Sequence, residues 1–113
     1  MDLRRIDALV AEHVLNIKLL PNGWEQDDRK FYGYLPTYSS DIAAAWEVVR
    51  QFHLFRLERL ENDIQGGETW SAEFIPAPYG SGETTCAIAD DPALAICLAA
   101  LKAKKIELPT ENE

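Results

Sequence analysis

The segment that decides the fold is Asp91-Pro92-Ala93-Leu94-Ala95-Ile96-Cys97-Leu98-Ala99-Ala100-Leu101-Lys102-Ala103-Lys104. Asp91 is a good helix cap, and proline is well tolerated at the first helical position after it. The apolar residues leave this helix almost no polar face, so we expect it to be buried on more than one side. Lys102 and Lys104 suit the negative end of the helix dipole.

Two further helices are expected upstream, each with one apolar side. From residue 3 to residue 17 the apolar residues recur at spacings of three and four, and charged residues, including Asp7, fall on the other side. Ser39-Ser40-Asp41 then supplies capping side chains for a helix over residues 41–52. Trp46 is the largest apolar residue of that helix, and we expect it to be the main anchor.

Strands are expected in two places between the helices. Residues 55–60 and 69–75 both alternate apolar and polar residues, which predicts an antiparallel hairpin. In that hairpin Glu58 and Glu73 fall on one face. Two shorter strands are expected around Asp27-Asp28, with residues 18–20 as an extended segment before them.

The expected order is therefore α-β-β-α-β-β-α. Helices with one apolar side must cover a sheet, and alternation within the strands favours antiparallel pairing. We predict an α+β fold, a three-helix α-β-α sandwich around one short, mainly antiparallel sheet. Residues 1–106 should form a single domain, with a loop at 76–82 and a polar tail at 107–113.

Composition narrows the classes of function. The chain has 113 residues and a formal net charge of −8, which disfavours binding to DNA, RNA or anionic lipid. No apolar run approaches the length of a membrane span, and the first residues do not resemble a secretory signal. We expect a cytoplasmic protein in which Cys86 and Cys97 are free thiols.

No catalytic or metal-binding set stands out. His13 and His53 lack partners at metal-ligand spacing, and we expect no cofactor and no metal. Glu58 and Glu73 are a candidate acid/base pair, but solvated ion pairs are the simpler interpretation.

Binding residues are more plausible than catalytic ones. Aromatic side chains are frequent in the expected loops and edge strands, and Arg56 and Arg59 lie on a rigid strand. We select as candidate ligand-binding residues Trp24, Tyr34, Arg56, Arg59 and Tyr79. The alternative is that the aromatics complete the core and that the arginines form surface ion pairs.

Three segments, 6–14, 40–49 and 92–103, with Trp70-Ser71-Ala72-Glu73-Phe74 between the last two, resemble the phage α-β-α (ABA) sandwich domain family. The resemblance implies a sandwich fold encoded by a phage or prophage, and it brings no catalytic motif.

Two functional hypotheses follow from the resemblance and from the lack of a catalytic set. The first is a non-enzymatic phage accessory protein that acts by binding and sequesters a nucleotide-like immune signal of the host. The second is a protein-protein interaction module that binds a host or phage protein through a sheet edge or the apolar third helix, which also suggests a homodimer or higher homo-oligomer.

Overall fold

The computed structural model describes residues 2–52, 54–61, 68–75 and 85–106. In chain order these residues form α1 (Leu3–His13), β1 (Lys18–Leu20), β2 (Gly23–Gln26), β3 (Arg29–Tyr32), α2 (Ile42–Val49), β4 (Leu54–Glu61), β5 (Glu68–Ile75), β6 (Thr85–Ala89) and α3 (Pro92–Ala103). The expected loop at 76–82 and tail at 107–113 lie outside the described residues.

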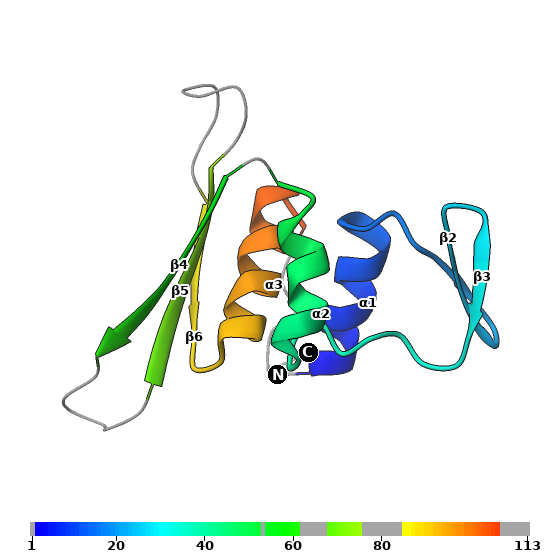
Figure 1. Ribbon diagram of the computed structural model, residues 1–113, viewed down its shortest axis with the longest axis horizontal. Helices are drawn as coiled ribbons and strands as arrows, with labels where there is room; N and C mark the ends of the chain where they lie inside the picture. The colour runs from blue at the N-terminus through cyan, green and yellow to red at the C-terminus, as the bar shows by residue number, and fades with distance from the viewer. Residues whose placement is uncertain (1, 53, 62–67, 76–84, 107–113) are drawn as a thin grey trace.

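The strands divide into two antiparallel sheets that lie on opposite sides of a helical layer (Figure 1). The large sheet has the order β4-β5-β6 and the small sheet the order β1-β2-β3. Helix α3 lies next to the large sheet, and α1 lies next to the small one (Figure 1). The α+β class, the three helices and the antiparallel pairing are confirmed within the described part of the chain, whereas the expectation of one common sheet is wrong.

Helix α3 occupies the centre of the core. The Asp91 carboxylate accepts hydrogen bonds from the amides of Ala93 and Leu94, as expected of the cap. Every residue from Ala95 to Leu101 is buried, because the helix packs against α1, α2, β5 and β6 at once. The prediction that this helix is covered on more than one side is confirmed.

The large sheet presents small and aromatic residues to α3. Ala72 of β5 and Ala87 of β6 are buried opposite each other, so the alanines of α3 can approach the sheet closely. Phe74 is also buried, and its ring stacks on that of Phe52 with centroids 4.1 Å apart. The predicted hairpin of residues 55–60 and 69–75 is confirmed, with Phe55 opposite Phe74.

Strand β6 was not expected from the sequence. Its two inward positions, Ala87 and Ala89, are small, and its outward positions include the exposed Ile88, so apolar residues do not alternate with polar ones. The strand exists because β5 supplies its hydrogen-bonding edge, with Trp70 to Phe74 in register against Ala89 to Thr85.

Two helices end earlier than predicted. Helix α1 stops at His13 because Asn16 adopts a left-handed conformation (φ 55°) and the Ile17 amide turns back to the Ala11 carbonyl. Helix α2 stops at Val49, with Arg50 as its cap.

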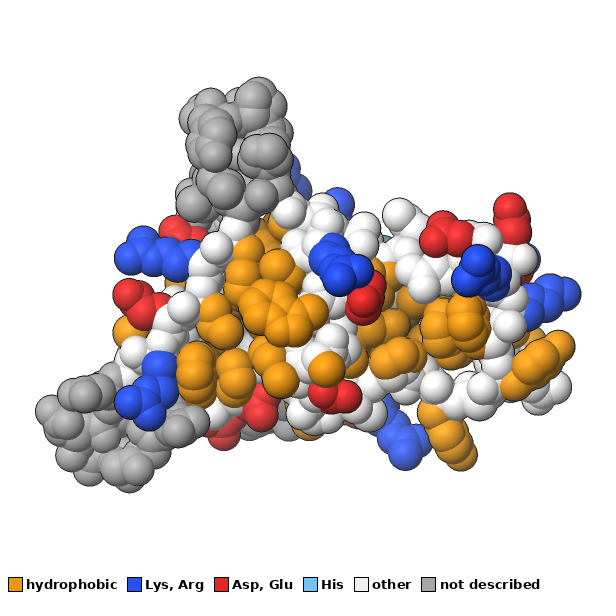
Figure 2. Space-filling model, in the orientation of Figure 1, with side chains coloured by type: hydrophobic (Ala, Val, Ile, Leu, Met, Phe, Trp, Pro, Cys, Tyr) orange, Lys and Arg blue, Asp and Glu red, His pale blue; other side chains and the backbone are white. Residues whose placement is uncertain are grey.

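The expectation that Trp46 is the main anchor of α2 is also wrong. Its side chain is 46% exposed and meets Phe55 edge-to-face, with ring centroids 5.8 Å apart. It lies at the surface because Ala45 and Val48 form the buried side of this helix. Figure 2 shows apolar side chains gathered on this side of the molecule, over α2 and the neighbouring part of the large sheet.

None of the helices in the described part of the chain has the length and apolarity needed to span a bilayer.

Two isoleucines, one buried in α3 and one exposed on β6, test the central role of α3. Ile96→Ala should lower the free energy of unfolding by about 2–5 kcal/mol, because it opens a cavity in a core that α3 fills. Ile88→Ala, on the exposed side of β6, should change it by no more than about 0.5 kcal/mol. Urea unfolding followed by circular dichroism measures both, and equal losses would contradict the assignment of α3 to the centre.

Candidate functional site

A cleft of about 590 Å³ lies between the start of α1 and the small sheet. Its walls come from the first turns of α1, from the turn between β1 and β2, and from the segment that follows β3. The polar and aromatic lining residues are Arg4, Asp7, Asn22, Tyr34 and Thr37, and two glycines, Gly23 and Gly33, lie between them.

Two glycines shape the wall formed by the small sheet. At Gly23 a Cβ atom would collide with the backbone of Phe31, so only glycine permits this close approach of β2 and β3. Gly33 has a φ of 103°, a conformation that glycine tolerates best, and its amide donates to the Asn22 carbonyl at 3.0 Å. The chain therefore leaves β3 in the direction that brings Tyr34 to the cleft.

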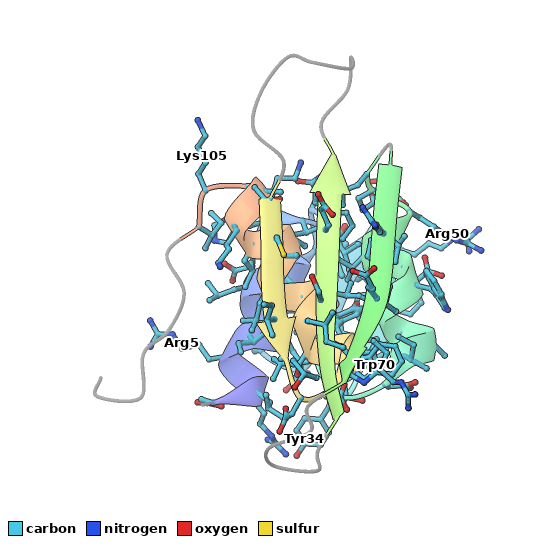
Figure 3. The ribbon with its side chains drawn as sticks, turned by 90° about the vertical axis from the view of Figure 1, so that its left-hand side faces the viewer. Arg5, Tyr34, Arg50, Trp70 and Lys105 are labelled. Atoms are coloured by element: carbon cyan, nitrogen blue, oxygen red, sulfur yellow. The ribbon has the colours of Figure 1, made fainter. Side chains whose placement is uncertain are left out.

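The N-terminus of α1 places Arg4 on the opposite wall. The Asp2 carboxylate accepts hydrogen bonds from the amides of Arg4 and Arg5 at 3.1 and 3.3 Å and so caps the helix. The Arg4 guanidinium carbon lies 5.5 Å from the centroid of the Tyr34 ring, within cation-π range. Tyr34 is 89% exposed, and Figure 3 shows it at one end of the molecule.

Asp7 is the buried charge of the cleft. Its side chain is only 6% exposed, and its Oδ1 accepts a hydrogen bond from the Ser39 amide at 2.8 Å. Within the described residues, no hydrogen bond reaches the second carboxylate oxygen. The expectation that Asp7 lies on the polar side of the first helix is wrong, because the segment before α2 folds over it.

Tyr38 lies beside this buried carboxylate. Burial raises the pKa of its phenol from 10.0 to about 12, and the negative charge of Asp7 adds to the shift. The phenol is therefore neutral at physiological pH.

The structure does not gather the five predicted ligand-binding residues into one site. Tyr34 lines the cleft, whereas Trp24 is partly buried and stacks on Phe31 with ring centroids 4.1 Å apart. Arg56 and Arg59 lie on β4, on the far side of the helical layer (Figure 1). Tyr79 lies outside the described residues.

Sequence reasoning missed Arg4 and Asp7 as site residues. Both are separated from Tyr34 by about a quarter of the chain, and nothing in the local pattern pairs the start of α1 with the turn after β3. The one available signal was Gly33 followed directly by Tyr34, because a glycine at this place marks a turn and the turn can leave the next ring exposed.

The candidate acid/base pair lies on the outer face of the large sheet. Glu73 pairs with Arg56 across the strands, and the Glu58 carboxylate lies 3.7 Å from the Arg56 guanidinium. Arg56 and Glu58 are exposed, in agreement with the simpler interpretation of solvated ion pairs.

The remaining chemical candidates do not form a site. Both cysteines are free, as expected, and burial raises the pKa of the Cys97 thiol well above its usual range. In the parts of the chain that the structure describes, no group of three His, Cys, Asp or Glu side chains is arranged to hold a metal ion.

The described residues form three helices and antiparallel sheets, an α+β fold of the kind that the family resemblance implies. The family model of the phage ABA sandwich domain matches residues 8–101. The chain therefore belongs to the phage ABA sandwich domain family.

Solved structures support the same fold. The chain is similar to a phage protein from Bacillus cereus ATCC 14579, with 24% sequence identity and a TM-score of 0.71. The alignment covers 96% of this chain and 93% of that one, so the likeness extends over the whole fold. A comparison with curated proteins gave no match.

Substitution of Asp7 tests whether the carboxylate holds the segment before α2. Asp7→Ala should lower the free energy of unfolding by about 1–3 kcal/mol, because the buried Ser39 amide loses its acceptor. Asp7→Asn keeps a carbonyl oxygen and should cost less. Glu12→Ala, at an exposed position of the same helix, is the control in urea unfolding, and a loss equal to that of Asp7→Ala would refute the role.

Tyr38 gives a pH prediction. The unfolded chain releases the phenolic proton near pH 10 and the folded chain near pH 12, so stability should fall as the pH rises through this range. Tyr38→Phe should reduce that fall by about 1–3 kcal/mol. Urea unfolding between about pH 9 and 12 measures it, with Tyr32→Phe as the exposed control. An unchanged fall in Tyr38→Phe would disprove the assignment.

Proposed function

We propose that this phage-family protein acts by binding rather than by catalysis, and that the cleft between α1 and the small sheet holds a small, planar, anionic ligand of nucleotide type. The observation that carries the proposal is the arrangement of Arg4, Tyr34 and Asp7 around one cavity. Together they offer a cation, an exposed aromatic face and a buried hydrogen-bond acceptor.

The size of the cleft supports a small-molecule ligand. Ligand pockets typically enclose about 300–1,000 Å³ and combine apolar walls with a few placed polar groups. This cleft has about 590 Å³, and Leu20, Pro21 and Leu35 supply its apolar lining. A mononucleotide or dinucleotide would fit that range.

The exposed ring and the cation suit the two halves of a nucleotide. The Tyr34 ring can stack on a nucleobase, since base-aromatic stacking contributes about 1–3 kcal/mol per base. The Arg4 guanidinium offers a planar fork of donors for phosphate oxygens.

The net charge of −8 opposes anion binding, but it is unevenly distributed. Residues 1–35 contain five bases and six acids, a formal charge of −1, whereas residues 36–113 contain six bases and thirteen acids, a formal charge of −7. The cleft is built mainly from the first part, so an anion there meets little of the repulsion.

Asp7 adds selectivity. Asp7 lines the cleft, and its carboxylate favours a ligand that brings an N–H or O–H donor, such as the amino edge of a nucleobase. A ligand that places only acceptors against Asp7 would leave this charge unsatisfied.

Membership of a phage family indicates which nucleotides to try first. Cyclic nucleotides and ADP-ribose derivatives that signal in host immunity have the required ring, phosphate and donor groups. Tight binding would remove such a signal from solution without changing it.

The rival hypothesis is a protein-protein interaction module that uses the apolar third helix or a sheet edge. Residues Ala95 to Leu101 of α3 are buried, so the sheet edge is the better candidate for such an interaction.

Calorimetry against a panel of cyclic mononucleotides, cyclic dinucleotides and ADP-ribose tests the cleft. At least one compound should bind saturably, and Arg4→Ala and Tyr34→Ala should each weaken that binding about tenfold or more, equivalent to about 1.4 kcal/mol. Arg5→Ala is the matched control, because Arg5 (labelled in Figure 3) is exposed and does not line the cleft. No heat from any compound, or equal weakening by Arg4→Ala and Arg5→Ala, would reject the proposal.

A further inference from the structure

Strand β3 is an edge of the small sheet, because the strand order is β1-β2-β3. All four of its residues, Arg29-Lys30-Phe31-Tyr32, are exposed. Tyr32 is 82% exposed and Phe31 38% exposed, an unusual presentation of large rings beside an open backbone edge. Such an edge is a ready template for pairing with another strand.

The backbone groups on the open side can be assigned. The Gly33 amide donates to the Asn22 carbonyl across the pair formed by β2 and β3. Because the direction of backbone groups alternates along a strand, the amides of Phe31 and Arg29 also face β2, and those of Lys30 and Tyr32 face away from it. No described segment pairs with this outer side of β3.

We propose that β3 pairs antiparallel with β3 of a second copy of the chain, about a two-fold axis at Phe31. Hydrogen-bonded pairs require outward-facing residues on both strands, so Lys30 must lie opposite Lys30 or Tyr32 of the other copy. A two-fold axis at Lys30 sets two ammonium groups against each other. An axis at Tyr32 runs past Gly33, whose φ of 103° ends the extended strand. Only the axis at Phe31 pairs the whole strand.

In this register the strand complements itself. Lys30 lies opposite the partner's Tyr32, and the reverse pair forms by symmetry, so each ammonium group meets a ring. Phe31 lies opposite the partner's Phe31 in a non-hydrogen-bonded pair, in which side chains approach most closely. Because each Phe31 already stacks on Trp24, four rings would line up across the junction.

Charge does not oppose a second copy in this register. Each strand carries two bases, but Lys30 lies opposite the partner's Tyr32 and Arg29 opposite the partner's Gly33, so no like charges lie directly opposite each other. Residues 1–35, which contain the small sheet, have a formal charge of only −1, so two copies can meet there despite the net charge of −8. The junction would join two three-stranded sheets into one and place the partner's Arg29 beside Gly33, at the wall of the cleft.

Sedimentation equilibrium over protein concentrations from about 10 µM to about 1 mM tests the pairing without any ligand. The mass should rise from 12.7 kDa toward twice that value. Tyr32→Lys sets two ammonium groups opposite each other and should raise the dimer dissociation constant at least about tenfold. Ile88→Lys adds the same charge at an exposed position of the large sheet and should leave the dissociation constant unchanged.

Hydrogen exchange identifies the strand and the register. Amide exchange at Lys30 and Tyr32 should slow as the protein concentration rises, whereas the Phe31 amide should be protected already in the monomer. The double variant Lys30→Glu with Tyr32→Lys creates opposite charges at the paired positions and should recover the dimer.

A wild-type mass of 12.7 kDa at every concentration would overturn the proposal, as would concentration-dependent protection elsewhere but not at Lys30 and Tyr32. Ligand binding does not enter either measurement. Failure of the pairing is therefore separable from failure of the cleft.

Discussion

The structure depends on the need to cover an apolar helix on every side. Helix α3 contributes an unbroken buried run from Ala95 to Leu101, and water contact along any side of it would cost about 25 cal/mol for each Å² exposed. The large sheet covers one side, and α1 and α2 cover the others. The alanines of α3 and of the sheet, Ala72 and Ala87, let these layers approach closely, and this is why the fold places all three helices together.

One polar contact links this core to the cleft. The buried Asp7 carboxylate accepts a hydrogen bond from the Ser39 amide, and Ser39 lies directly before the segment that caps α2. The hydrogen bond from the Ser39 amide offsets part of the cost of burying that carboxylate. The same side chain therefore holds the segment from Thr37 to Ser39 in place and also lines the cleft, so fold and candidate site share a residue.

Sequence reasoning succeeded where the local pattern and the tertiary demand agree. Residues 92–103 are capped, apolar and helical by every criterion, and the hairpin of β4 and β5 alternates clearly. It failed where contacts with a distant segment determine the local structure. Strand β6 is a strand only because β5 offers an edge, and Asp7 is buried only because the chain returns over α1 some 30 residues later. The cleft was beyond prediction for the same reason. Tyr34 was selected for its aromatic ring. Its partner Arg4 lies at the start of α1, about a quarter of the chain earlier, and no rule of sequence spacing connects these two positions.

The two ends of the molecule differ in how their surface is stabilised. On the outer face of the large sheet, charges pair with each other, as Arg56 does with Glu58, and Ile88 of β6 is exposed beside them. At the small sheet, Tyr32 and Tyr34 remain in water, and burying such a ring would yield about 1.5–3 kcal/mol that the isolated chain does not use. A domain of this size has only a small net stability, so unused burial of that magnitude favours association. The cleft and the β3 edge meet at Gly33, where a ligand would use the ring of Tyr34 and a second chain the rings of Phe31 and Tyr32.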